Sequence, residues 1–122
     1  MNTLVLVLVL VVAALHAFFF VLEAILWTKP YGRKVFRTTE AFAKESAVLA
    51  MNQGLYNLFL TAGLVWGVIA GHGVMVGNPV IVFFLACVIV AGIVGGLTSN
   101  PRIFLIQGVP AIVALALVLL VG

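Results

Sequence analysis

Two ionisable side chains lie inside the first apolar stretch of the sequence, where a charged group is costly. His16 and Glu23 are seven residues apart, so on a helix they lie about 20° apart and share one face. Glu23 is the only acidic residue inside any of the apolar stretches. An intramembrane carboxyl or imidazole needs a partner or a water-filled cavity. This pair therefore predicts either proton handling or a buried polar network.

Polar side chains of the other apolar stretches fall at a similar depth. Depth is measured from the basic ends of the helices at about 1.5 Å per residue. A first polar layer lies within roughly 10 Å of these ends and contains Glu23, Asn52, Gln53, Thr98 and Gln107. A deeper layer, His16 and Asn57, lies roughly 16–18 Å from them. We therefore predict a polar pocket that opens to the cytoplasm and binds a ligand or handles protons. Its candidate residues are His16, Glu23, Asn52, Gln53, Tyr56, Asn57, Thr98 and Gln107.

The helices that would position these residues are predicted from composition. The chain has 122 residues, of which 66% are hydrophobic and 7% charged, whereas soluble domains carry roughly a quarter charged residues. A membrane-spanning helix needs about 20 apolar residues. The sequence therefore predicts an all-α, membrane-spanning four-helix bundle, with residues 1–122 as one transmembrane domain. The predicted helices cover about 3–27, 46–71, 79–98 and 102–121.

The basic residues predict the orientation. All six lie in the first connection, 28–45, or at the third, in Ser99-Asn100-Pro101-Arg102, and none lies in the Gly-rich second connection around 71–78. In a four-span chain the first and third connections face the same side. By the positive-inside rule that side is the cytoplasm, so both termini are expected outside the cytoplasm. The expected location is the cell membrane, most simply a bacterial cytoplasmic membrane.

Small and polar residues predict which faces pack. From Thr39 the chain is expected to become helical, with Glu40 and Lys44 paired four residues apart. In the second span the amides and Tyr56 project to one side together with Gly63, Gly67 and Gly71, so this side is expected to face protein. The opposite side, which includes Leu58, is expected to face lipid. The glycines indicate either helix packing or an oligomer seam.

Several classes of site are not supported by the sequence. One cysteine, Cys87, excludes an intrachain disulfide. One His, one Glu and one Cys on separate levels do not form a metal shell. No cofactor motif, phosphate loop or nucleic-acid platform is present. The partners predicted are membrane lipids and a small-molecule ligand, with a homo-oligomer as an open alternative.

Five segments carry a family resemblance. They are LHAFFFVLEAILW at 15–27, RKVF at 33–36, MNQGLYNLFLTAGL at 51–64, AGIVGGLT at 91–98 and QGVPAIVAL at 107–115. The set resembles the small bacterial and fungal membrane proteins of domain-of-unknown-function family 1304, in which a Gly commonly replaces Leu58. The resemblance implies four spans and no known activity. It singles out the eight candidate residues and Pro110.

Three functions remain open from the sequence. The first is a carrier that binds or transports a small molecule or a proton, similar in architecture to small multidrug transporters. The second is a structural or accessory subunit in which the polar layer fixes helix register. The third is an enzyme for a lipid-soluble substrate with Glu23 or His16 as acid or base. The sequence favours the carrier and does not assign a catalytic residue.

Overall fold

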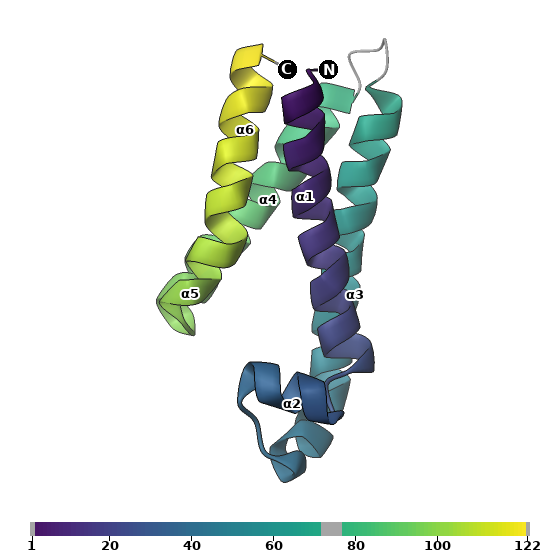
Figure 1. Cartoon of the computed structure of the whole chain (residues 1–122), viewed down its shortest axis with the longest axis vertical. Coiled ribbons are helices and arrows are strands. Elements are labelled where there is room, and N and C mark those ends of the chain that lie inside the picture. The colour runs from purple at the N-terminus through teal and green to yellow at the C-terminus, as the bar shows by residue number, and fades with distance from the viewer. Residues whose placement is uncertain (1, 72–76, 122) are drawn as a thin grey trace. The chain divides into compact units, whose positions relative to one another are not determined.

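The computed structural model describes residues 2–71 and 77–121, and these residues form an almost wholly helical chain (Figure 1). The first half contains α1 (Thr3–Phe20), the π-helical turn η1 (Val21–Ile25), the short helix α2 (Pro30–Phe36) and α3 (Glu40–Ala70). The second half contains α4 (Gly77–Thr98), α5 (Pro101–Ile103), the π-helical turn η2 (Phe104–Gly108) and α6 (Val109–Val121). Within the described ranges no residue lies in a strand.

Four segments of the described chain are long and apolar enough to cross a membrane. They are Thr3–Ile25, Glu40–Ala70, Pro79–Thr98 and Pro101–Val121. The last span joins α5, η2 and α6 end to end. These segments suggest a membrane protein and confirm the predicted all-α, four-helix fold class. The side of the membrane on which the termini lie stays a prediction, as does the single domain.

The chain divides into two compact units. One consists of Met1–Ala14 and Leu60–Gly122, and the other of Leu15–Phe59. Helices α1 and α3 contribute residues to both units. The first unit holds most of the apolar core, and the second holds α2 and most of the predicted polar residues.

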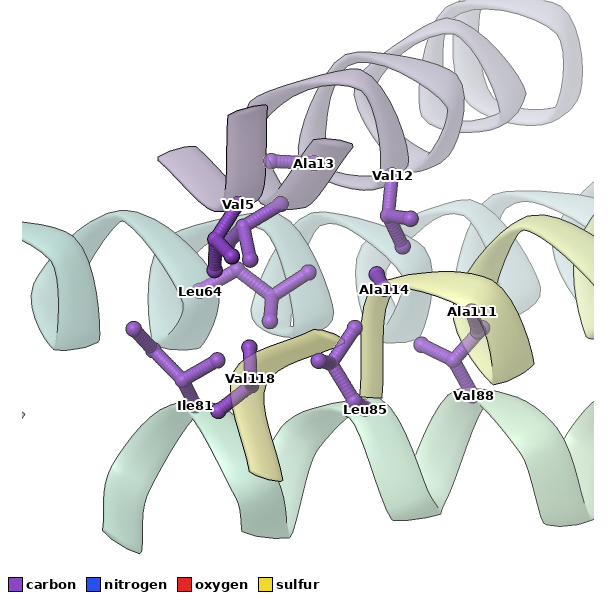
Figure 2. Packing of buried hydrophobic residues seen from close by; sticks show 11 residues of the cluster. Val5, Val12, Ala13, Leu64, Ile81, Leu85, Val88, Ala111, Ala114 and Val118 are labelled. Carbon is purple, nitrogen blue, oxygen red and sulfur yellow. The ribbon is translucent and has the colours of Figure 1, made fainter. Parts of the chain in front are cut away.

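The core of the first unit is aliphatic. Small and branched side chains from four helices meet in it, as Figure 2 shows for Val12 of α1, Leu64 of α3, Leu85 of α4 and Ala114 of α6. These four side chains are at most 1% exposed. Thr61 adds a polar link, since its Oγ1 donates to the carbonyl oxygen of Ala13 at 2.8 Å. Such a hydrogen bond satisfies both groups away from water.

Glycines set the closest helix approach in this unit. A Cβ on Gly92 of α4 would lie 2.9 Å from the Cα of Gly108 in η2. A Cβ on Gly63 of α3 would overlap the ring of Phe84. These contacts agree with the predicted packing role of small residues. Ala91 and Thr98 of α4 are exposed, whereas Gly92 is buried.

In the second unit, the first connection contains the short helix α2. Pro30 begins α2, where its fixed φ suits the first helical position, and Arg37 ends the helix in the left-handed conformation with φ 56°. Gly32 is buried and packs against Leu26, directly after η1. A Cβ at this position would overlap the carbonyl oxygen of Leu26, so the close contact requires glycine.

Trp27 ties this connection to α3. Its ring lies 4.9 Å from that of Phe36, and its Nε1 donates to Oγ of Ser46 at 3.0 Å. The Ser46 hydroxyl in turn donates to the carbonyl oxygen of Phe42 at 2.7 Å. The indole therefore joins α2 to the first turns of α3.

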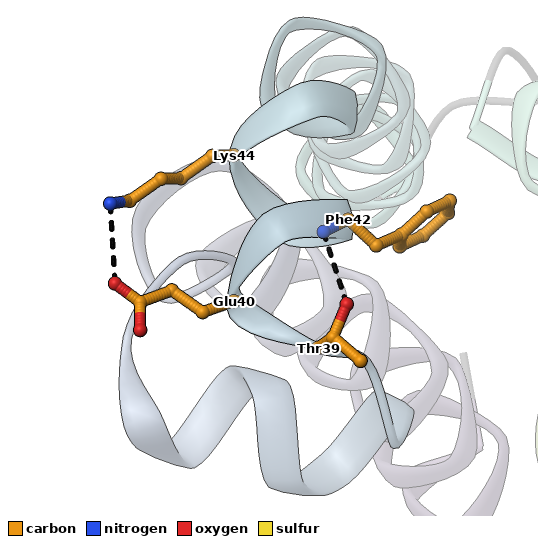
Figure 3. A network of polar contacts seen from close by, with 4 residues as sticks. All are labelled: Thr39, Glu40, Phe42 and Lys44. Atoms are coloured by element: carbon orange, nitrogen blue, oxygen red, sulfur yellow. Dashed lines mark hydrogen bonds and ion pairs between the residues drawn. The ribbon is translucent and has the colours of Figure 1, made fainter.

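Helix α3 begins before the apolar part of its sequence. The Thr39 hydroxyl accepts from the backbone N–H of Phe42 at 3.1 Å, and Lys44 pairs with Glu40 at 3.2 Å, as Figure 3 shows. The predicted helical start after Thr39 and the predicted ion pair are confirmed. The 31 residues of α3 are about 46 Å long at 1.5 Å per residue. Residues 72–76 of the predicted Gly-rich connection lie outside the described residues.

Candidate functional site

The structure brings together two of the predicted polar residues, Glu23 and Asn57. Nδ2 of Asn57 donates to Oε1 of Glu23 at 2.5 Å, across 34 positions of sequence. Both side chains are half-buried. Within residues 2–71 and 77–121 this is the one side-chain hydrogen bond that the structure gives Glu23. One carboxylate oxygen is therefore fixed by an amide of α3, while the second oxygen remains for another partner.

Glu23 lies in an irregular part of its helix. Residues Val21–Ile25 form the π-helical turn η1, closed by the backbone N–H of Leu26 donating to the carbonyl oxygen of Val21 at 3.0 Å. A π-helical turn is wider than an α-helical one and is frequent at functional sites. The extra width changes the direction of the side chains that follow, so projection at 100° per residue does not hold through Glu23.

Gly54 allows α3 to approach this turn. A Cβ on Gly54 would lie 3.1 Å from the backbone nitrogen of Ala24 and 3.2 Å from the carbonyl oxygen of Phe20. Gly54 is buried and lies one turn before Asn57 on α3. The close backbone contact therefore holds Asn57 within reach of Glu23.

His16 is fully buried, at 0% exposure. Its ring meets that of Phe19 edge to face, with centroids 5.2 Å apart and an interplanar angle of 74°. Seven residues separate it from Glu23, which is about 10 Å of helical rise. This rise places the two groups at different levels along the first span.

Asn52, Gln53 and Tyr56 are exposed in the single chain, so their predicted burial against the chain's own helices is wrong. In the first half of α3 the buried residues are Ala43, Ala50 and Gly54, which lie within about 60° of Asn57 around the helix. Asn52 and Tyr56 lie about 140° and 100° from Asn57, on the other side. Leu58, expected to face lipid, is half-buried.

Thr98 and Gln107 belong to the first unit. The Thr98 hydroxyl is exposed and donates to the carbonyl oxygen of Val94 at 2.6 Å. Gln107 is half-buried in η2. The predicted convergence of polar groups from all four spans stays a prediction. The π-helical turns η1 and η2 each carry one candidate residue, Glu23 and Gln107.

A comparison of the chain with known sequence families identifies its relatives. Residues 10–119 match the family described as protein of unknown function DUF1304. The chain belongs to this family. The match confirms the resemblance seen in the five sequence segments. Searches of curated proteins and of solved structures find no match.

Three features near Glu23 in this DUF1304 protein were not predicted as parts of a site. They are the π-helical turn η1, the glycine contact at Gly54 and the Trp27–Ser46 hydrogen bond. Gly54 lies in the segment MNQGLYN three residues before Asn57, which was a usable signal. Among the described residues, no group of three or more His, Cys, Asp or Glu side chains is placed to hold a metal ion.

This DUF1304 chain also has an apolar groove of about 500 Å³, remote in sequence from Glu23. It lies between the end of α4 and the start of the last span. Its walls are Ile93, Gly96, Leu97, Pro101, Phe104 and Leu105. None of the eight predicted site residues lines it, so it is separate from the polar site.

Proposed function

We propose that this protein is a small membrane carrier that binds a proton or a small organic cation at Glu23. The observation that carries the proposal is the hydrogen bond between Glu23 and Asn57, formed within an apolar span. A carboxylate in such a place is costly unless it is paired or reached by water. The Glu23 carboxylate is paired with Asn57 through one oxygen. Because its side chain is only half-buried, water can also reach it.

The chemistry of the site favours exchange of one positive charge for another. Asn57 fixes Oε1, so the second oxygen is left to take a proton or to pair with an ammonium or guanidinium group. A proton and an organic cation would then compete for one carboxylate. Competition of this kind couples the uptake of one to the release of the other.

The other candidate residues extend this site. His16 is buried on the same span and would act as a second proton station, linked to Glu23 through water. Gln53 lies about one turn before Asn57 on the same side of α3 and would contact the bound cation. By the positive-inside rule, the pocket opens to the cytoplasm.

Reconstituted vesicles test the carrier function. The purified chain is placed in phosphatidylcholine vesicles that contain the pH dye pyranine, and inward gradients of tetramethylammonium or guanidinium are applied. We expect the vesicle lumen to become more alkaline as cation enters and protons leave. Glu23→Gln should reduce this flux to the rate of empty vesicles, because the amide neither takes a proton nor pairs with a cation.

Glu45→Gln is the matched control, since Glu45 is an exposed carboxylate on the same helix as Asn57. This variant should keep the wild-type flux. Wild-type protein that moves neither cation, nor protons under an imposed potential, contradicts the proposal. A Glu23→Gln variant with unchanged flux contradicts it as well.

An accessory role is the second candidate, and the same hydrogen bond favours it. A carboxylate held by an amide would also lock the register of α1 on α3. In that case Glu23→Leu, which removes the acceptor for Asn57, should lower the resistance of the protein to unfolding, while wild-type vesicles show no flux. The vesicle and unfolding measurements together distinguish the two roles.

A further inference from the structure

The groove beside the last span is open and wholly apolar in its walls. Leu97 is 83% exposed and Leu105 is 61% exposed, so both present hydrocarbon to the surroundings. The volume of about 500 Å³ lies in the range of about 300–1,000 Å³ that is typical of ligand sites. Water gains no hydrogen bonds from such walls, so the occupant must itself be apolar where it touches them.

A glycine sets the floor of the groove. A Cβ on Gly96 would lie 2.9 Å from the Cβ of Phe104. The backbones of α4 and the last span therefore approach closely at this point, and the larger side chains on either side form the walls. The groove is thus fixed by the packing of two helices and does not depend on the side-chain conformation of one residue.

One end of the groove meets a polar turn. Pro101 lines the groove, and Arg102 follows it directly with an exposed side chain. The turn is held in shape by Asn100, whose Oδ1 accepts from the backbone N–H of Arg102 at 2.9 Å. Ser99 and Asn100 are exposed beside it. An apolar groove beside a turn that carries an exposed cation complements an anionic lipid, which has a hydrocarbon tail and an anionic head.

We propose that this groove binds one acyl chain of an anionic phospholipid whose phosphate pairs with Arg102. The guanidinium group recognises phosphate oxygens through two parallel hydrogen bonds. Anionic lipids also concentrate at the cytoplasmic face of membranes, where the basic connections of this chain are expected. The site is independent of Glu23 and of the carrier function.

Lipid retention tests the site. The protein is incubated with vesicles of equal parts phosphatidylcholine and phosphatidylglycerol and extracted in mild detergent, and the retained lipids are counted by native mass spectrometry. Wild-type protein should retain one phosphatidylglycerol in preference to phosphatidylcholine. Arg102→Gln should lower that preference by roughly fivefold, the effect of one basic residue near a membrane surface. Ile93→Trp should fill the groove and reduce retention of both lipids.

Lys34→Gln is the control for net charge, because it removes one exposed cation from α2, and it should leave the preference unchanged. Circular dichroism of each variant checks that the helices are retained. Equal loss in Lys34→Gln and Arg102→Gln overturns the site, and so does wild-type retention in Ile93→Trp. A change from dimer to monomer in Ile93→Trp, with no change in bound lipid, would instead assign the groove to a second copy of the chain.

Discussion

Asn57 and Glu23 are joined by a hydrogen bond of 2.5 Å although they lie 34 residues apart. The contact links the π-helical end of the first span to the middle of α3. It needs the backbone approach at Gly54 and the closed connection through Trp27. A polar contact of this kind is therefore a property of the packed second unit and not of either helix alone.

Removing the amide should destabilise the protein. Asn57→Leu leaves Glu23 without its donor in an apolar span, so we expect a loss of about 1–2 kcal/mol in the free energy of unfolding. Titration with sodium dodecyl sulfate, followed by circular dichroism, measures this loss. A double-mutant cycle with Glu23→Leu, which removes the acceptor, should return a coupling energy of about 0.5–2 kcal/mol. A coupling energy of zero would show that the bond does not contribute to stability.

Gly54 should tolerate no large side chain. Gly54→Val places two methyl groups where a Cβ is already 3.1 Å from Ala24, and the cost should be about 1–3 kcal/mol. The same detergent titration measures it. Ala62→Val is the control, because Ala62 is exposed on the same helix and its extra methyl groups should meet only lipid. Equal effects in the two variants would argue against a close contact at Gly54.

A similar prediction applies in the first unit to the close contact between Gly92 of α4 and Gly108 of η2. Gly92→Leu should push the backbone of Gly108 away, since even a Cβ would lie 2.9 Å from its Cα. We expect a loss of about 1–3 kcal/mol, measured as a lower melting temperature in detergent. Ala91→Leu changes the neighbouring, exposed position and should melt within a degree or so of the wild type.

Trp27 should stabilise the contact between α2 and the first turns of α3. Trp27→Phe keeps a ring against Phe36 but removes the donor to Ser46, and it should cost about 1 kcal/mol. Ser46→Ala should cost a similar amount, and the two changes should not be additive because they remove the same bond. Fluorescence gives a second test, since Trp27 is half-buried while Trp66 is 55% exposed. Brominated lipid should quench Trp66 more strongly than Trp27.

The predicted orientation is testable with single cysteines on a Cys87→Ser background. Tyr31→Cys and Ser99→Cys are both exposed positions at connections expected in the cytoplasm. A membrane-impermeant maleimide should label them only in inside-out vesicles, whereas Asn2→Cys should react in right-side-out vesicles. Reaction of Tyr31→Cys and Ser99→Cys from opposite sides would contradict the four-span topology.

The sequence predicted the helices better than it predicted their faces. Length and apolar character were sufficient for four spans, and the spacing of Glu40 and Lys44 was sufficient for the start of α3. Burial of Asn52 was mispredicted because the buried side of α3 changes along the helix: Gly63 projects to nearly the same side as Asn52 and is buried, whereas Asn52 is exposed. The direction of Glu23 could not be derived, because a π-helical turn has no simple signature in residue order. Pro110 gives a partial signal for η2, since its ring crowds the preceding turn.

The length of α3 has a consequence for the kind of membrane that suits this fold. About 46 Å of helix faces a hydrocarbon layer of about 30 Å, so some three turns extend past it. In a thicker or thinner bilayer, the membrane–water interface can cross α3 at a different residue of the segment that begins at Glu40, without disturbing the contacts around Leu64. The extra turns of α3 would let the protein fit bilayers of different thickness. Bilayer thickness would then set how much of the Lys44–Glu45 segment is hydrated.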